Sequence, residues 1–171
     1  MLAVPHDRVD DARAEVEGLS EVVVVPGGHT RQGSVRAALE LIDTETVVVH
    51  DAARPLTPAA LFDAVVDALS KADGAVPGTA VDETLKRVKE GRIVETIARA
   101  GLYRIQTPQA FRTSALKEAH RRAYRDGFEG TDDAQLLERV GYTIALVEGT
   151  APNPKLTHPA DFELAEALLR V

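Results

Sequence analysis

The sequence predicts an α/β protein with a Rossmann-like, mostly parallel sheet flanked by helices. Short runs of β-branched residues alternate with amphipathic stretches along the chain, and this alternation is typical of a doubly wound sheet. The first three runs are almost continuously apolar, as expected for parallel strands covered on both faces. The 171 residues contain no linker and no internal repeat, so one domain over residues 1–171 is predicted.

The predicted strands are the β-branched runs, which are bounded by polar or turn-forming residues. They are Glu21–Val25, Thr46–His50, Gly74–Pro77 and Tyr142–Val147. In a sheet of this kind ligands bind at the carboxyl ends of the strands. The residues that directly follow each strand are therefore the first candidates for a functional site.

Helices are predicted where apolar residues recur every three or four positions. Thr57 is a plausible cap for the third helix, and Pro58 suits its first position. The predicted helices are Asp7–Leu19, Thr30–Ile42, Pro58–Lys71, Thr113–Arg125, Thr131–Val140 and Pro159–Leu169.

One segment departs from this alternation and predicts a β-hairpin. Thr84–Val88 and Arg92–Ile97 flank Lys89-Glu90-Gly91, which is a turn signal. Neither face of this ribbon is purely apolar, and an isolated two-stranded ribbon is marginally stable. We therefore expect an arm over about residues 82–100 that packs against another subunit. The alternative is a solvated hairpin on a monomer.

Composition excludes several classes of protein. The 27 Asp and Glu outnumber the 20 Lys and Arg, giving a formal charge of −7 that argues against general nucleic-acid binding. No apolar run approaches the ~18–20 residues that span a bilayer, and no signal-peptide pattern is present, so no membrane partner is expected. The absence of Cys excludes a disulfide framework and Cys-ligated zinc, and it fits a cytoplasmic location.

Two segments that follow strands carry the residues most suited to chemistry. In Val49-His50-Asp51-Ala52-Ala53-Arg54-Pro55, the carboxylate of Asp51 suits a metal, Arg54 suits a phosphate, and the small alanines leave room for a ligand. Pro26–Val35 contains Gly27 and Gly28 and opens a helix, whose N-terminus attracts anions. It matches neither GxGxxG nor GxxxxGK[ST]. A capped loop and a simple strand-to-helix turn are the alternative interpretations.

Other polar residues are weaker candidates. Thr107 lies at a bend fixed by Pro108, and Lys155 follows the last predicted strand, where it could reach a phosphate. Thr131 is explained by a role as a helix cap. For His6, His120 and His158 we expect surface or capping roles, because their spacing does not suit a metal site.

Six segments in order along the chain carry a resemblance to a known family. They are GGHTRQGSV, VVVHDAARP, VDETLKRV, RIQTPQAF, GTDDAQLLE and NPKLTHPADFELAEALL. Together they resemble the 2-C-methyl-D-erythritol 4-phosphate cytidylyltransferase family over residues 1–171. The resemblance implies a nucleotidyltransferase domain that joins CTP to methylerythritol phosphate and releases pyrophosphate, in the non-mevalonate route to isoprenoids. It also implies Mg²⁺ as cofactor and a homodimer formed through the arm.

The resemblance also implies roles for individual residues. The residues expected to bind CTP are Gly28, Arg31, Ser34, Asp51 and Ala52, with Asp51 also facing the metal. The residues expected to hold the acceptor are Thr84, Arg99, Thr107, Thr131 and Arg54. The expected catalytic residues are Arg54, Lys155, Thr84 and Arg99, and Thr84 and Arg99 of the arm are expected to act in the neighbouring subunit's site.

The N-terminus differs from the family pattern. Family members begin with a strand and a glycine-rich loop that carries an Arg and a Lys, whereas Met1–Pro5 resembles the family's second strand. We therefore expect an N-terminally incomplete domain with an exposed strand edge. Three explanations are open: an incomplete chain, an inactive dimeric nucleotide-binding module, or a second polypeptide that supplies the strand. A different acceptor, such as ribitol 5-phosphate, is the alternative substrate.

Overall fold

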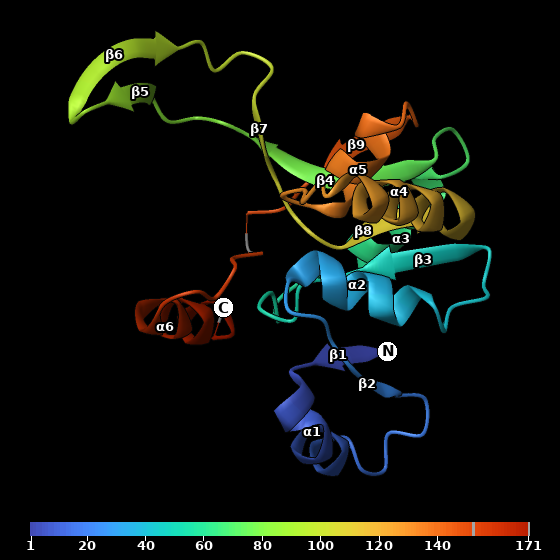
Figure 1. The fold of residues 1–171 in the computed structure, drawn as a ribbon. Coiled ribbons are helices and arrows are strands. Elements are labelled where there is room, and N and C mark those ends of the chain that lie inside the picture. Colours follow the sequence, from blue (N-terminus) through green and yellow to red (C-terminus); the bar gives the residue numbers. More distant parts are fainter. Residues whose placement is uncertain (152, 171) are drawn as a thin grey trace.

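A computed structural model describes residues 1–151 and 153–170 (Figure 1). The strands are β1 (Leu2–Val4), β2 (Val24–Pro26), β3 (Thr46–Val49), β4 (Gly74–Ala80), β5 (Leu85–Lys89), β6 (Arg92–Ile97), β7 (Tyr103–Ile105), β8 (Gln109–Arg112) and β9 (Ile144–Glu148). The helices are η1 (His6–Arg8, a 3₁₀ turn), α1 (Val9–Glu15), α2 (Arg31–Leu39), α3 (Ala59–Ala68), α4 (Thr113–Asp126), α5 (Asp133–Arg139) and α6 (Pro159–Leu168). The predicted α/β class is confirmed, and within the described residues no helix is long and apolar enough to cross a bilayer.

The main sheet contains five strands, with β8 between β3 and β4 and with β9 on the other edge of β4. β3, β4 and β9 run in one direction, as predicted. The sheet is more mixed than predicted, because β7 and β8 run against them. The chain around Pro108 was expected to form a bend and no strand. The bend is present, but a strand lies on each side of it, and these strands, β7 and β8, pair with successive parts of β4.

β1 and β2 form a separate parallel pair below the main sheet (Figure 1). A cleft of about 360 Å³ lies between this pair and β3 and is lined by both β1 and β3. In the described part of the chain, β1 pairs only with β2 and β3 pairs only with β8, so each has one unpaired edge. This agrees with the expected exposed edge. It also explains why β3 is half-buried although its sequence predicts burial on both faces.

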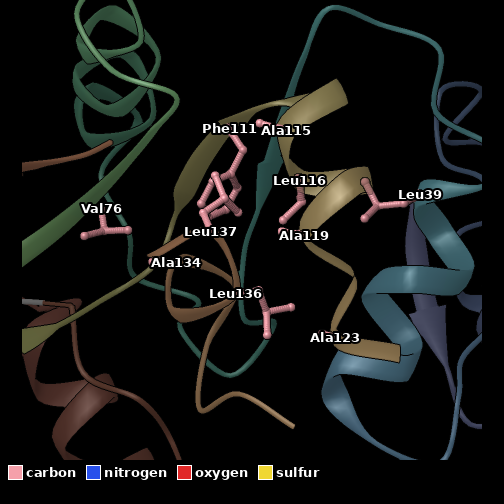
Figure 2. Packing of buried hydrophobic residues seen from close by; sticks show 10 residues of the cluster. All are labelled: Leu39, Val76, Phe111, Ala115, Leu116, Ala119, Ala123, Ala134, Leu136 and Leu137. Atoms are coloured by element: carbon pink, nitrogen blue, oxygen red, sulfur yellow. The ribbon is translucent and has the colours of Figure 1, made fainter. Parts of the chain in front are cut away.

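The core lies on both faces of the main sheet, and β8 shows why. Phe111 and Ala110 alternate along this strand, so their side chains point to opposite faces. Phe111 packs with Leu116 of α4 and Leu137 of α5 (Figure 2). Ala110 packs with Val65 of α3 on the other face. Both layers therefore fix the position of the chain just before and after β8.

The predicted hairpin is present as β5 and β6, which project from the body (Figure 1). Glu90 and Gly91 form its turn, with φ values of 50° and 75°. Two such residues suit the two-residue turns that match strand twist. The large apolar side chains Val88, Ile93 and Val94 are exposed.

Two predicted helix caps are wrong. Pro58 rather than Thr57 precedes the first turn of α3, because the Thr57 hydroxyl donates instead to the carbonyl of Arg54 and to Asn153. Asp132 rather than Thr131 caps α5, since its carboxylate accepts from the backbone N–H of Gln135.

Candidate functional site

The loop after β3 is fixed by the bend before β8. The backbone N–H of Asp51 donates to Oγ1 of Thr107 at 3.0 Å, and Nδ1 of His50 lies 3.0 Å from the same hydroxyl. Nε2 of His50 contacts the carbonyl of Arg54 at 3.1 Å. A carbonyl only accepts, so we assign the ring hydrogen to Nε2, and Nδ1 then accepts from Thr107. The hydroxyl of Thr107 thus uses its one hydrogen and one of its acceptor positions within the protein.

A third segment, after β9, closes on the same loop. Asn153 is buried, and its side-chain amide donates to the carbonyl of Thr107 at 3.0 Å. Its backbone carbonyl accepts from the guanidinium of Arg54 at 2.7 Å. The backbone N–H of Leu156 donates to the carbonyl of Ala53 at 2.8 Å. These contacts place Lys155 beside the end of β3.

The carboxylate of Asp51 lies between two cations. Nε of Arg31 is 3.1 Å from Oδ1, and Nζ of Lys155 is 2.9 Å from Oδ2. Burial alone would raise the pKa of the Asp51 carboxyl, but hydrogen bonds from Lys155 and Arg31 outweigh it, and the pKa is lowered. Asp51 is therefore ionised at neutral pH.

Arg54 provides a third cation next to this carboxylate. Burial lowers the pKa of its guanidinium, and the charge of Asp51 opposes that shift. Arginine nevertheless stays protonated in proteins. The end of β3 therefore gathers Arg31, Arg54 and Lys155 around one carboxylate, which suits a ligand carrying several negative charges.

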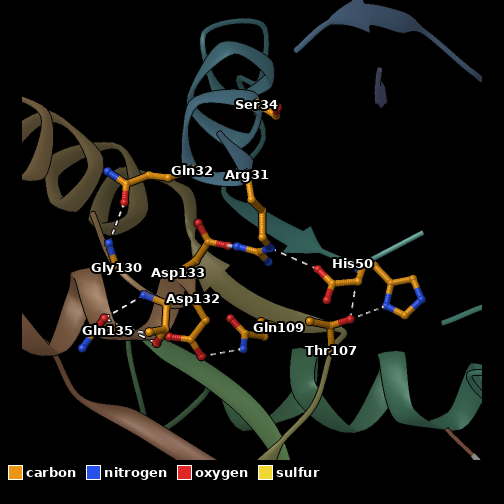
Figure 3. A network of polar contacts seen from close by, with 12 residues as sticks. Arg31, Gln32, Ser34, His50, Thr107, Gln109, Gly130, Asp132, Asp133 and Gln135 are labelled. Atoms are coloured by element: carbon orange, nitrogen blue, oxygen red, sulfur yellow. Dashed lines mark hydrogen bonds and ion pairs between the residues drawn. The ribbon is translucent and has the colours of Figure 1, made fainter. Parts of the chain in front are cut away.

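Arg31 also reaches a second carboxylate, as Figure 3 shows. Its guanidinium donates to Oδ2 of Asp133 at 2.6 Å, and Oδ1 of Asp133 lies 2.8 Å from Nε2 of His120. His120 and Asp133 are each 1% exposed. The expectation of a surface or capping role for His120 is therefore wrong. The signal was its place four residues after Leu116 on the apolar face of α4.

The glycine turn after β2 is explained by packing. A Cβ on Gly28 would lie 2.7 Å from the backbone carbon of Gly33, so the turn and the first turn of α2 are in close contact. The backbone N–H of Gly28 donates to Oγ of Ser34 at 3.1 Å. Among the predicted CTP-binding residues, Arg31, Ser34, Asp51 and Ala52 line the cleft between β1 and β3, and Gly28 does not.

The other predicted site residues are not brought to Asp51 within one chain. Thr84 and Arg99 lie at the base of the arm, where the guanidinium of Arg99 donates to the carbonyl of Asp82. Thr131 is exposed, and its hydroxyl donates to the side chain of Gln135 at 3.4 Å. In the described residues no hydrogen bond or ion pair links these three to Asp51, Arg54 or Lys155.

At the end of β3, Asp51 is the carboxylate that could bind a divalent cation. Within the described ranges, no group of three or more His, Asp or Glu residues could hold a metal ion. Asp51 alone still fits Mg²⁺, which is commonly bound by one or two carboxylates together with water and substrate phosphates.

Comparison with known proteins identifies relatives over the whole chain. The model of the family "IspD: 2-C-methyl-D-erythritol 4-phosphate cytidylyltransferase" matches residues 1–171. The enzyme of that name from Bacillus velezensis is 46% identical over 88% of this chain, and that from Salinibacter ruber is 44% identical over 98%. The chain covers 66% and 73% of these two relatives. A bifunctional enzyme IspD/IspF from Rhodospirillum rubrum is 48% identical over 97% of the chain, which covers 44% of that protein.

Solved structures agree in fold. The cytidylyltransferase from Thermus thermophilus has a TM-score of 0.85 and 44% identity, with 91% of this chain and 76% of that chain covered. The 4-diphosphocytidyl-2C-methyl-D-erythritol synthase from Anaerococcus prevotii has a TM-score of 0.90 and 29% identity, with 99% and 80% covered. On this evidence the chain belongs to the 2-C-methyl-D-erythritol 4-phosphate cytidylyltransferase (IspD) family, whose members are nucleotidyltransferases.

Proposed function

We propose that this chain provides the site for cytidylyl transfer from CTP to 2-C-methyl-D-erythritol 4-phosphate, giving CDP-methylerythritol and pyrophosphate for isoprenoid biosynthesis. Membership of the family supports the reaction. The observation that carries it in this chain is the pair of contacts that Arg31 and Lys155 make with Asp51 at the carboxyl end of β3, with Arg54 held in the same loop close enough to feel the charge of Asp51.

The chemistry needs cations more than it needs a base. A phosphate oxygen of the acceptor attacks the α-phosphorus of CTP, and the bond from that phosphorus to the oxygen bridging to the β-phosphate breaks. The attacking phosphate is already an anion, so no proton must be removed from it. Catalysis of such a step is mostly alignment and charge neutralisation. Arg54 and Lys155 are placed to neutralise phosphate charge. Arg31 and Ser34, which line the cleft between β1 and β3, are residues that the resemblance assigns to CTP binding.

Mg²⁺, also part of the proposal, would be held by Asp51 together with substrate phosphates, and it would add positive charge next to them. The two cations on Asp51 differ in what anchors them. Lys155 is 44% exposed and contacts only this carboxylate among the ion pairs of the described residues, whereas Arg31 is also bound by Asp133. We infer that Lys155 is the cation that moves from Asp51 to a phosphate, while Arg31 stays in place.

A pyrophosphate-release assay tests the reaction. The assay variants are made in the chain preceded by the first strand and glycine-rich loop of a relative, called the extended chain, except where the 171-residue chain is named. We expect Arg54→Ala and Lys155→Ala each to lower CTP-dependent turnover by about 10²–10³-fold, the usual effect of removing one preorganised charge stabiliser. Lys71→Ala is the control, because this exposed lysine lies between α3 and β4, at the opposite end of the sheet. Full turnover in both the Arg54 and the Lys155 variant would contradict the assignment of the site.

The contribution of the glycine-rich loop is measured in the same assay. Turnover of the 171-residue chain is compared with that of the chain preceded by the first strand and glycine-rich loop of a relative. We expect little turnover from the former, because that loop carries two cations in the family. Normal turnover without it would show that the loop is dispensable.

Calorimetry with CTP and Mg²⁺ on the 171-residue chain tests the alternative of a nucleotide-binding module without activity.

The acceptor is tested by offering methylerythritol phosphate and ribitol 5-phosphate side by side. Family membership favours methylerythritol phosphate, so we expect a higher kcat/KM with it. A preference for ribitol 5-phosphate would assign the chain a different acceptor within the same chemistry.

We further propose a homodimer in which the arm brings Thr84 and Arg99 to the partner's site. The hairpin that projects from the body (Figure 1) and the exposed apolar side chains on it support this. Coexpression of Arg99→Ala and Lys155→Ala chains tests it, because each mixed dimer then regains one intact site. Random pairing predicts recovery of about a quarter of wild-type turnover. If Arg99 acts within its own chain, mixing restores nothing.

We place this activity in the cytoplasm. The chain has no cysteine, which fits a reducing compartment. Fractionation of cells expressing a tagged chain would check this, and recovery in the periplasmic fraction would contradict it.

A further inference from the structure

A buried ionisable pair lies behind the candidate site. His120 of α4 and Asp133 at the start of α5 are each 1% exposed, and their side chains contact at 2.8 Å. Burial of a carboxylate is costly unless it is paired and hydrogen-bonded. Both oxygens of Asp133 are paired, one with His120 and one with Arg31. The pair therefore joins the core to a residue of the cleft.

The hydrogen in this contact belongs to the histidine. Burial alone would raise the pKa of the Asp133 carboxyl, but the hydrogen bond from His120 and the charge of Arg31 outweigh it, and the pKa is lowered. An ionised carboxylate only accepts hydrogen bonds, so Nε2 of His120 donates. This donation fixes the orientation of the carboxylate that Arg31 meets.

Arg31 divides its donors between two carboxylates. One terminal nitrogen donates to Asp133, and Nε donates to Asp51. The guanidinium is planar and rigid, so fixing one edge sets the direction of the other donors. The Asp133 side of Arg31 is buried, and the Asp51 side opens to the cleft. The buried contact therefore fixes the orientation of the guanidinium that meets Asp51.

A neighbouring link offers a control. Gln32 follows Arg31 on α2 and connects the same helix to the loop before α5. Its side chain accepts from the backbone N–H of Gly130 (Figure 3) and donates to the carbonyl of Phe128. It contacts neither carboxylate of the Arg31 network. Loss of Gln32 therefore weakens the joint between α2 and that loop without removing a partner of Arg31.

We propose that His120 and Asp133 are positioning residues that hold Arg31, and through it Asp51, in the orientation required at the cleft. The consequence for catalysis rests on the proposed function. The effect on Arg31 itself does not.

The test measures the Arg31 side chain directly. The 171-residue chain is labelled with ¹⁵N-arginine, and Arg31→Lys identifies the Nε–H resonance. We expect that resonance to exchange at least about tenfold faster with water in His120→Leu, the factor for losing about one net hydrogen bond. His120→Gln keeps a donor in the side chain and should recover part of the protection. Gln32→Ala should leave the resonance unchanged.

A second control separates positioning from general destabilisation. Leu116→Ala removes a fully buried side chain from the same face of α4, so it lowers stability without removing a hydrogen-bond or ion-pair partner from the Arg31 network. If it accelerates exchange at Arg31 as much as His120→Leu does, the role of His120 is only structural and the proposal is overturned. Should His120→Leu fail to fold, Asp133→Asn carries the same comparison.

Turnover supplies the functional part of the test. In the chain preceded by the first strand and glycine-rich loop of a relative, His120→Leu should lower kcat/KM for CTP and leave KM for the acceptor unchanged. His120→Gln should restore part of the lost kcat/KM. Normal kinetics together with a mobile Arg31 would overturn the link to the site. If the wild-type chain bound no CTP while the Arg31 resonance behaved as expected, the proposed function would fail and the positioning of Arg31 would stand.

Discussion

Thr107 and Thr113 form a matched pair on either side of β8, and we expect opposite results from the same substitution. Each is 5% exposed. The hydroxyl of Thr107 accepts from the backbone N–H of Asp51 and contacts Nδ1 of His50. The hydroxyl of Thr113 has no hydrogen-bond partner among the described residues. Valine replaces threonine with almost the same shape, so the change isolates the hydroxyl.

The expected magnitudes follow from the partners left behind. Thr107→Val leaves the N–H of Asp51 without its acceptor, and an unsatisfied buried polar group costs about 1–3 kcal/mol. Thr113→Val removes a hydroxyl that gains nothing from its burial, so the free energy of unfolding should stay level or rise by up to about 1 kcal/mol.

Urea unfolding followed by circular dichroism measures both effects, with unchanged m-values as the sign that only stability has changed. For a chain of this size, 1 kcal/mol corresponds to a shift in Tm of about 2–4 °C. Equal losses in the two variants would refute the reasoning, because they would mean that a threonine is needed at either position whatever its partners.

Two further predictions concern the turn before α2 and the buried acid. Gly28→Ala should lower the free energy of unfolding by about 1–3 kcal/mol because its Cβ meets the backbone of Gly33. Gly33→Ala should be neutral or stabilising, since its Cβ has room and alanine favours a helix; urea midpoints that reverse this order would contradict the packing. Ionised Asp133 stabilises the fold fully above its unfolded pKa of about 3.9, and this contribution is lost as the pH falls through its lowered folded pKa. The difference in stability between wild type and Asp133→Asn should therefore narrow as the pH falls below about 5, and a difference independent of pH would exclude the ionised pair.

The sequence predicts best those helices and strands whose pattern of apolar residues reflects burial against the core. The predicted helices and the four predicted strands all occur, although most of their boundaries differ by a few residues. The largest misses are β7 and β8, which are short and interrupted at Pro108. Three or four residues give too few positions for a period to show, and these strands are specified by pairing with β4, which is distant in the sequence.

The sequence predicts several residues of the candidate site, but it does not predict which of them contact one another. Asp51, Arg54 and Lys155 stand out because charged residues follow strands, and the structure brings all three together. His120 and Asp133 did not stand out, because a lone histidine and a first-turn acid have ordinary explanations in any helix. Only the meeting of α4, α5 and α2 reveals that they pair with each other and with Arg31.

The contacts around Asp51 also explain why family motifs far apart in sequence can act as one unit. Thr107 binds the backbone of Asp51, Asn153 binds both Thr107 and Arg54, and each contact joins protein groups to one another. A site built this way holds Asp51 and Arg54 in place before a nucleotide arrives, and such preorganisation lowers the cost of reorganisation during phosphate chemistry. It follows that Asn153, which carries no charge but hydrogen-bonds both the loop after β3 and the bend before β8, should affect turnover as strongly as a residue that contacts substrate.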